Sequence, residues 1–122
     1  MNKLIQASEN GDVEIVRLLL ETGESKPGHA NEDGNTALIL ASWNGRVEIV
    51  RLLLETGESK PGHVNNNGYT ALIHASLNGY TEIVRLLLET GESRPGNANK
   101  YGDIALIRAS WDGHLEIVRR LL

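Results

Sequence analysis

Apolar residues recur along the chain in pairs of short blocks separated by a polar break. Residues 37–41 form an apolar run after Thr36, whose hydroxyl can accept from the free N–H groups of a first helical turn. A polar break at 44–45 ends the run, and the apolar positions of 47–54 fall at helical spacing. Gly57 is placed for a left-handed C-terminal turn. The pattern predicts a helix, a tight turn, a second helix and a loop.

This unit returns at a fixed period. The stretch from Ala37 to Gly57 recurs 34 residues later and begins again at Ala105, and its second half is already present at 4–23. A period of about 20 to 50 residues is typical of solenoids, in which helices too short to be stable alone pack on neighbouring repeats. We expect one domain, 1–122, made of an N-terminal cap repeat (1–30), two full repeats (31–64 and 65–98) and a truncated repeat (99–122).

The connectors between the helix pairs keep their register as well. The first, ESKPGHANEDGN at 24–35, recurs as ESKPGHVNNNGY and ESRPGNANKYGD, with Pro27, Pro61 and Pro95 at matching positions. Pro-Gly and Asp-Gly pairs favour tight turns. These segments are therefore predicted to be ordered, projecting, hairpin-like loops rather than flexible linkers.

The repeated motifs resemble those of the ankyrin-repeat family. The residues that carry the resemblance are GNTALILASWNGRVEIVRLLLETG at 34–57 and GYTALIHASLNGYTEIVRLLLETG at 68–91, with partial copies at 4–23 and 102–122. Two features depart from the family pattern. Its T-P-L-H appears as T-A-L-I, without the histidine that bridges neighbouring loops in the family, and the repeat is 34 residues long rather than 33.

The resemblance implies an all-α solenoid of stacked helix-turn-helix units with projecting hairpin-like loops. It also implies a non-catalytic protein-protein interaction module with a concave recognition surface. In this family, partners are gripped by the hairpin tips and the inner helical face, which match most of the positions that vary between the repeats of this chain. The candidate partner-binding residues are Glu32, Asp33, Asn35, Trp43, Arg46, Asn66, Asn67, Tyr69, His74, Leu77, Tyr80, Lys100, Tyr101, Asp103, Arg108, Trp111 and His114.

The five aromatic residues of the chain all occupy variable positions. Tryptophan and tyrosine are enriched among interface hot spots because they bury large rigid areas. We interpret Trp43 and Trp111 as exposed rather than core residues, and we expect Tyr69 and Tyr101 to be exposed in turns. The charged variable residues are acidic in the early repeats and mixed in the last one, so the sequence does not assign the charge of a partner.

Composition narrows the classes of function. The longest apolar runs, about six residues, are too short to span a membrane. The net charge of −4 argues against nucleic acid as a partner, because phosphate binding needs clustered Lys and Arg. The absence of cysteine excludes disulfides and fits an intracellular, cytoplasmic location. We expect a monomer that binds another protein and uses no cofactor.

Candidate chemistry in the sequence is weak. His29 and His63 match in register, but equivalent positions in stacked repeats are expected about 8 to 10 Å apart, too far for one metal ion to bridge at about 2 Å per bond. His74 and His114 have no Ser or Cys nucleophile at a recognisable spacing, and no G-x-x-x-x-G-K-[ST] phosphate loop occurs. We therefore expect neither a metal site nor an enzyme.

Other interpretations remain beside the interaction module. The chain could be a structural spacer or the N-terminal segment of a longer ankyrin solenoid, or an engineered repeat scaffold. Arg119 and Arg120 place charge where the inner copies carry Arg and Leu, which suits a repeat with nothing stacked beyond it. The sequence stops at Leu122 without the E-T-G that ends the other second helices, so a further hypothesis is that it is a fragment of a longer protein.

Overall fold

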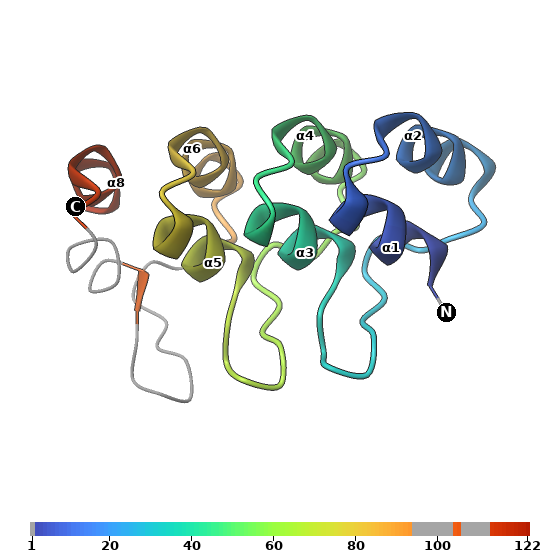
Figure 1. Ribbon diagram of the computed structural model, residues 1–122, viewed down its shortest axis with the longest axis horizontal. Coiled ribbons are helices and arrows are strands. Elements are labelled where there is room, and N and C mark those ends of the chain that lie inside the picture. Colours follow the sequence, from blue (N-terminus) through green and yellow to red (C-terminus); the bar gives the residue numbers. More distant parts are fainter. Residues whose placement is uncertain (1, 94–103, 106–112) are drawn as a thin grey trace.

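The computed structural model describes residues 2–93, 104–105 and 113–122. Its helices are α1 (Lys3–Asn10), α2 (Val13–Thr22), α3 (Ala37–Trp43), α4 (Val47–Glu55), α5 (Ala71–Asn78), α6 (Thr81–Glu89) and α8 (Leu115–Leu121). They stand in two rows, with α1, α3 and α5 in one and α2, α4, α6 and α8 in the other (Figure 1). The expected all-α stacked-repeat fold is confirmed. The expected first helix of the last repeat falls largely on 106–112, outside the described residues.

The first helix of each described repeat begins at a polar cap. The Oγ1 atom of Thr36 accepts from the backbone N–H of Ile39 (3.2 Å), and Thr70 does the same for Ile73 (3.1 Å). In the first repeat the Oδ1 atom of Asn2 takes this role for its helix. Each bond satisfies a donor that the helix itself leaves unpaired. The predicted start of these helices is confirmed.

The tight turn between paired helices depends on a left-handed glycine. Gly11, Gly45 and Gly79 have φ values of 84°, 73° and 77°. A side chain of the next repeat lies against each of them: Arg46 at Gly11, Tyr80 at Gly45 and His114 at Gly79, all within 3.0 Å of where a β-carbon would be. Glycine is needed here both for its backbone conformation and for the close approach of the next repeat.

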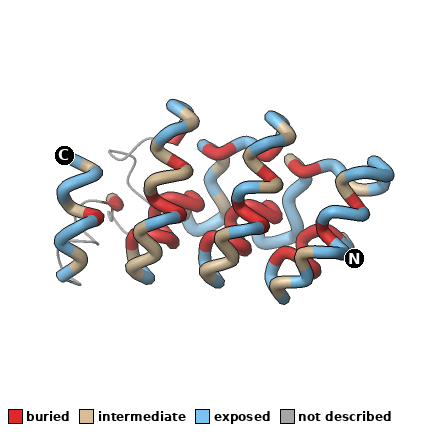
Figure 2. Tube along the Cα trace, turned by 90° about the horizontal axis from the view of Figure 1, so that it is seen from above, coloured by how far each residue is buried: buried red, intermediate tan, exposed pale blue. Residues whose placement is uncertain are grey.

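The core runs through the stack between the two rows of helices. Leu38 and Leu72 from the first helices and Ile49 and Ile83 from the second are at most 1% exposed. Buried stretches recur from one repeat to the next in Figure 2. α1 packs on α3 and α3 on α5, while α2, α4, α6 and α8 follow one another in the second row. Each repeat thus buries its apolar face mainly against its neighbours.

The described loops project on one side of the stack from the row formed by α1, α3 and α5, which we call the inner row (Figure 1). Each of these loops is built around an asparagine. The Oδ1 atom of Asn31 accepts from the backbone N–H groups of Asp33 and Asn35, both at 3.0 Å. Asn65 makes the same pair of bonds in the next loop, to Asn67 and Tyr69 (2.9 Å each). The prediction that these segments are ordered hairpin-like loops is confirmed for the described ones.

Neighbouring loops are also bonded to each other. The backbone N–H of Asn66 donates to the carbonyl of Asp33 (3.0 Å), and its side-chain amide donates to the carbonyl of Glu32 (2.9 Å). The Nε2 atom of His63 donates to the carbonyl of Gly34 (2.9 Å), which requires a proton on that nitrogen. A histidine in the connector thus bridges two loops, although the family's bridging histidine is missing from the T-A-L-I motif.

Candidate protein-interaction surface

Three aromatic rings meet on the loop side of the inner helices. The indole of Trp43, at the end of α3, stacks on the imidazole of His74 in α5, with ring centroids 4.4 Å apart and planes 7° from parallel. Tyr69, from the second loop, also stacks on His74, at 4.7 Å and 28°. We call Trp43, His74 and Tyr69 the aromatic stack. It joins two repeats and a loop through side chains alone.

His74 is the buried member of the stack. Its side chain is only 4% exposed, and neither ring nitrogen has a hydrogen-bond partner among the described residues. Burial lowers the pKa of His74 from 6.5 to about 4, because the charged imidazolium would lose its hydration. The ring is therefore neutral at pH 7. Although it was expected to contact a partner, His74 lies beneath the surface and supports Trp43 from below.

Trp43 is the exposed member of the stack. It retains 45% of its accessible surface, so the interpretation of this residue as exposed is confirmed. The expectation that Tyr69 is exposed is wrong, because this residue is half-buried and packs against the core. Stacking on His74 draws it inward. The exposure of Trp111 and Tyr101 cannot be compared, since both lie outside the described residues.

Two grooves adjoin Trp43. The first, which we call the acidic groove, has a volume of about 830 Å³ and lies between α1, α3 and the first loop. Its lining includes the carboxylates Glu9, Glu32 and Asp33 together with Leu40 and Trp43. The second, which we call the amide groove, has a volume of about 590 Å³. It is lined by the aromatic stack, Leu77, Asp33 and the side chains of Asn35, Asn65, Asn66 and Asn67.

The predicted partner-binding residues separate into several groups. Glu32, Asp33, Trp43, Asn66 and Asn67 are exposed, and all of them line one or both grooves. Tyr69 and Leu77 are half-buried in the amide groove, and Asn35 and His74 are buried at its floor. Five further candidates, Lys100, Tyr101, Asp103, Arg108 and Trp111, lie outside the described residues.

One class of predicted site residues packs between repeats. Arg46, Tyr80 and His114 are each half-buried and lie against the turn glycine of the preceding repeat. The Nε atom of Arg46 also donates to the carbonyl oxygen of Glu9 (3.2 Å). These side chains couple one repeat to the next, and none of them lines either groove.

Several residues of the surface were not among the predicted ones. Glu9 and Leu40 line the acidic groove, and Asn65 holds the second loop while its side-chain amide donates to Asn35 Oδ1 (2.8 Å). The signal for Asn65 is its identity with Asn31 and Asn99 in register. Glu9 and Leu40 occupy the same repeat positions as Trp43 and His74, so their register could have identified them.

Some charged groups elsewhere on the described surface pair with each other. Arg85 on α6 bonds to Glu82 and Glu89, and the bond from Arg85 lowers the pKa of Glu82. Arg51 of α4 lies 3.7 Å from the same Glu82. The described residues contain no group of three His, Cys, Asp or Glu side chains that could hold a metal ion. No described helix is both long and apolar enough to cross a membrane.

Comparison with known protein families agrees with the fold. A family model described as ankyrin repeats (3 copies) matches residues 1–61 and 57–122, which together span the whole chain. The comparison with curated proteins gave no match. Ankyrin repeats generally serve as protein-protein interaction modules. The chain belongs to the ankyrin-repeat family.

Proposed function

We propose that this chain is a non-catalytic protein-interaction module whose recognition surface is centred on Trp43. The surface comprises the two grooves that adjoin Trp43, the inner helices α3 and α5, and the loops 31–35 and 65–69. The observation that carries the proposal is that Trp43 combines 45% exposure with a fixed position on a neighbouring ring.

An exposed tryptophan whose ring is stacked on a neighbouring side chain is suited to binding a partner. Tryptophan is among the residues most often found at interface hot spots, and an exposed indole releases a large apolar area from water when a partner covers it. Stacking on His74 restricts the rotamers of Trp43 before any partner arrives. Less conformational entropy is then lost on binding than for a free side chain.

The two loops are also ordered before a partner binds. The bonds from His63 and Asn66 to the preceding loop connect the two hairpins through backbone carbonyls. A partner that spans both loops meets a surface that is already ordered, which lowers the cost of association.

The distribution of perturbed groups supports recognition rather than catalysis. Among the described residues the pKa shifts fall on His74, which lies under Trp43, and on the exposed Glu82–Arg85 pair of α6. Neither arrangement joins a nucleophile to a base in a groove, as covalent catalysis requires. The proposal includes a monomeric, intracellular module without a cofactor and without affinity for nucleic acid, in line with the net charge of −4.

The test is capture of partners from an extract of the source organism on three immobilised proteins: the native chain, Trp43→Ala and Leu18→Ala. Leu18 on α2 is 59% exposed and lies outside both grooves, so its truncation removes a comparable exposed apolar side chain elsewhere. Circular dichroism establishes that all three are folded. We expect a protein retained by the native chain and Leu18→Ala but lost from Trp43→Ala. Equal retention by all three, or none by the native chain, contradicts the proposal and favours a structural role.

A further inference from the structure

The acidic groove carries unneutralised negative charge. Its lining includes the carboxylates Glu9, Glu32 and Asp33 and no Lys, Arg or His side chain. None of the three carboxylates forms an ion pair within the described part of the chain. Arg46 approaches Glu9 only at its carbonyl oxygen and lies over Gly11. By contrast, the carboxylates of Glu82 and Glu89 on α6 are paired with Arg85.

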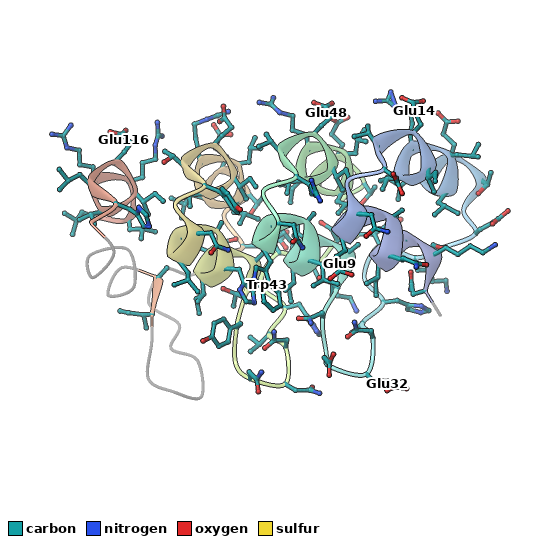
Figure 3. The ribbon with its side chains drawn as sticks, in the orientation of Figure 1. Glu9, Glu14, Glu32, Trp43, Glu48 and Glu116 are labelled. Atoms are coloured by element: carbon teal, nitrogen blue, oxygen red, sulfur yellow. The ribbon has the colours of Figure 1, made fainter. Side chains whose placement is uncertain are left out.

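The main chain that carries these carboxylates is held by the fold. Glu9 is in the last turn of α1, and the main chain at Glu32 and Asp33 is held by two bonds from Asn66. Figure 3 shows Glu9 and Glu32 on the same side of the helices as Trp43, whereas Glu14, Glu48 and Glu116 lie on the opposite side. The groove therefore presents three negatively charged side chains, carried on an ordered main chain, beside an exposed aromatic ring.

An indole beside carboxylates is a favourable place for a cation. The face of tryptophan attracts Lys and Arg more strongly than that of any other aromatic residue, and Arg also stacks flat on it. The ring that packs under Trp43 does not oppose this attraction, because His74 is neutral at pH 7.

The amide groove supplies hydrogen-bonding groups next to the acidic groove. Its lining includes the exposed residues Asn66 and Asn67. An amide side chain both donates and accepts, so it can pair with the N–H and C=O groups of an extended backbone.

We propose that the two grooves beside Trp43 bind a basic, extended segment of a partner protein. A Lys or Arg side chain of that segment lies on the open part of the indole and is neutralised by Glu9, Glu32 and Asp33. The neighbouring backbone follows the amide groove. This inference rests on the proposed function, which it deepens by assigning the chemistry of the partner.

The experiment measures fluorescence anisotropy of labelled peptides about 10 residues long that alternate Arg, Gln or Glu with Ser. The groove variant combines Glu9→Gln, Glu32→Gln and Asp33→Asn. Its matched control combines Glu14→Gln, Glu48→Gln and Glu116→Gln, which makes the same change in net charge on the opposite side of the helices (Figure 3). Trp43→Leu keeps an apolar side chain but removes the aromatic face.

We expect the native chain to bind the Arg peptide at least about tenfold more tightly than the Gln peptide and more tightly still than the Glu peptide. The groove variant should lose about tenfold or more, Trp43→Leu about three- to tenfold, and the control less than about twofold. Raising the salt from about 50 to 200 mM should weaken binding to the native chain and the control much more than binding to the groove variant.

The inference is overturned if the native chain does not prefer the Arg peptide, or if the control loses as much affinity as the groove variant. The second result would mean that only net charge matters. These failures are distinct from failure of the proposed function. Suppose that a protein is captured in a Trp43-dependent manner but the chain shows no preference for the Arg peptide. The proposed interaction module would then stand, and the inference that its partner segment is basic would be rejected.

Discussion

The indole of Trp43 in one repeat stacks on the imidazole of His74 in the next, with the ring centroids 4.4 Å apart. Both residues occupy positions that vary between repeats, and the corresponding pair one repeat earlier is Glu9 and Leu40. That pair lines the acidic groove. The same two positions thus place two stacked aromatic rings at one repeat junction and a glutamate with a leucine at the previous one.

The buried imidazole makes stability depend on pH. In the unfolded chain His74 takes up a proton as the pH falls through 6.5, but in the folded protein only near pH 4. Stability is therefore lost as the pH falls through this window, by about 2 kcal/mol between about pH 7 and about pH 5. Urea unfolding of the native chain and of His74→Phe at both values checks this. The variant should lose about 2 kcal/mol less, and an identical loss in both proteins would exclude His74 as the cause.

Substitutions at Gly45 and Gly57 separate the backbone strain of a side chain at positive φ from its steric clash with a neighbouring residue. Both have φ near +73° and +72°, but a β-carbon at Gly45 would lie 2.8 Å from the ring of Tyr80, whereas nothing lies within 4 Å at Gly57. We expect Gly57→Ala to lower the free energy of unfolding by about 1 kcal/mol and Gly45→Ala by about 2 kcal/mol or more. Thermal and urea unfolding give both values. If Tyr80 is the obstacle, Gly45→Ala should be less costly in a Tyr80→Ala background, and an unchanged cost would refute that role.

The loop bridge at His63 has a natural control in the same register. His63→Ala removes the bond to Gly34 and should lower the free energy of unfolding by about 1 kcal/mol. His29→Ala changes an exposed residue and should have little effect. Hydrogen exchange adds a local measurement, because backbone protection in the loop 31–35 should fall only in His63→Ala. Equal effects of the two substitutions would show that the bridge does not stabilise the loop.

The helix caps predict a graded series. Thr36→Ala should lower the free energy of unfolding by about 1 kcal/mol, because the N–H of Ile39 loses its acceptor, whereas Thr36→Ser keeps the hydroxyl and should lose less. Thr70→Ala should behave in the same way at α5. Urea unfolding distinguishes the variants, and equal losses for Ser and Ala at position 36 would show that the methyl group matters rather than the cap.

The stacking of helix pairs could be predicted from the sequence because the same helix-turn-helix pattern occurs several times at a fixed period. The cap at Thr36 and the left-handed turn at Gly57 are local features, determined within a few residues, and both were predicted correctly. The exposure of Trp43 was also predicted, from its restriction to a variable position.

The roles of other variable residues depend on the neighbouring repeat. Tyr80 varies in register with Arg46 and His114, yet all three pack against a glycine of the preceding repeat. His74 is buried because Trp43 and Tyr69 happen to be aromatic at the positions that meet it. Comparison of repeats shows which positions differ, but not whether a side chain meets solvent or the adjacent repeat.

Contact of a partner with Trp43 is the central claim, and photo-crosslinking tests it most directly. Benzoylphenylalanine placed at position 43 or, as a control, at position 18 is irradiated in an extract of the source organism. We predict one protein that crosslinks at position 43, is competed by the unmodified native chain but not by Trp43→Ala, and is absent at position 18. The same product from both positions, or none at position 43, would contradict a recognition surface centred on Trp43.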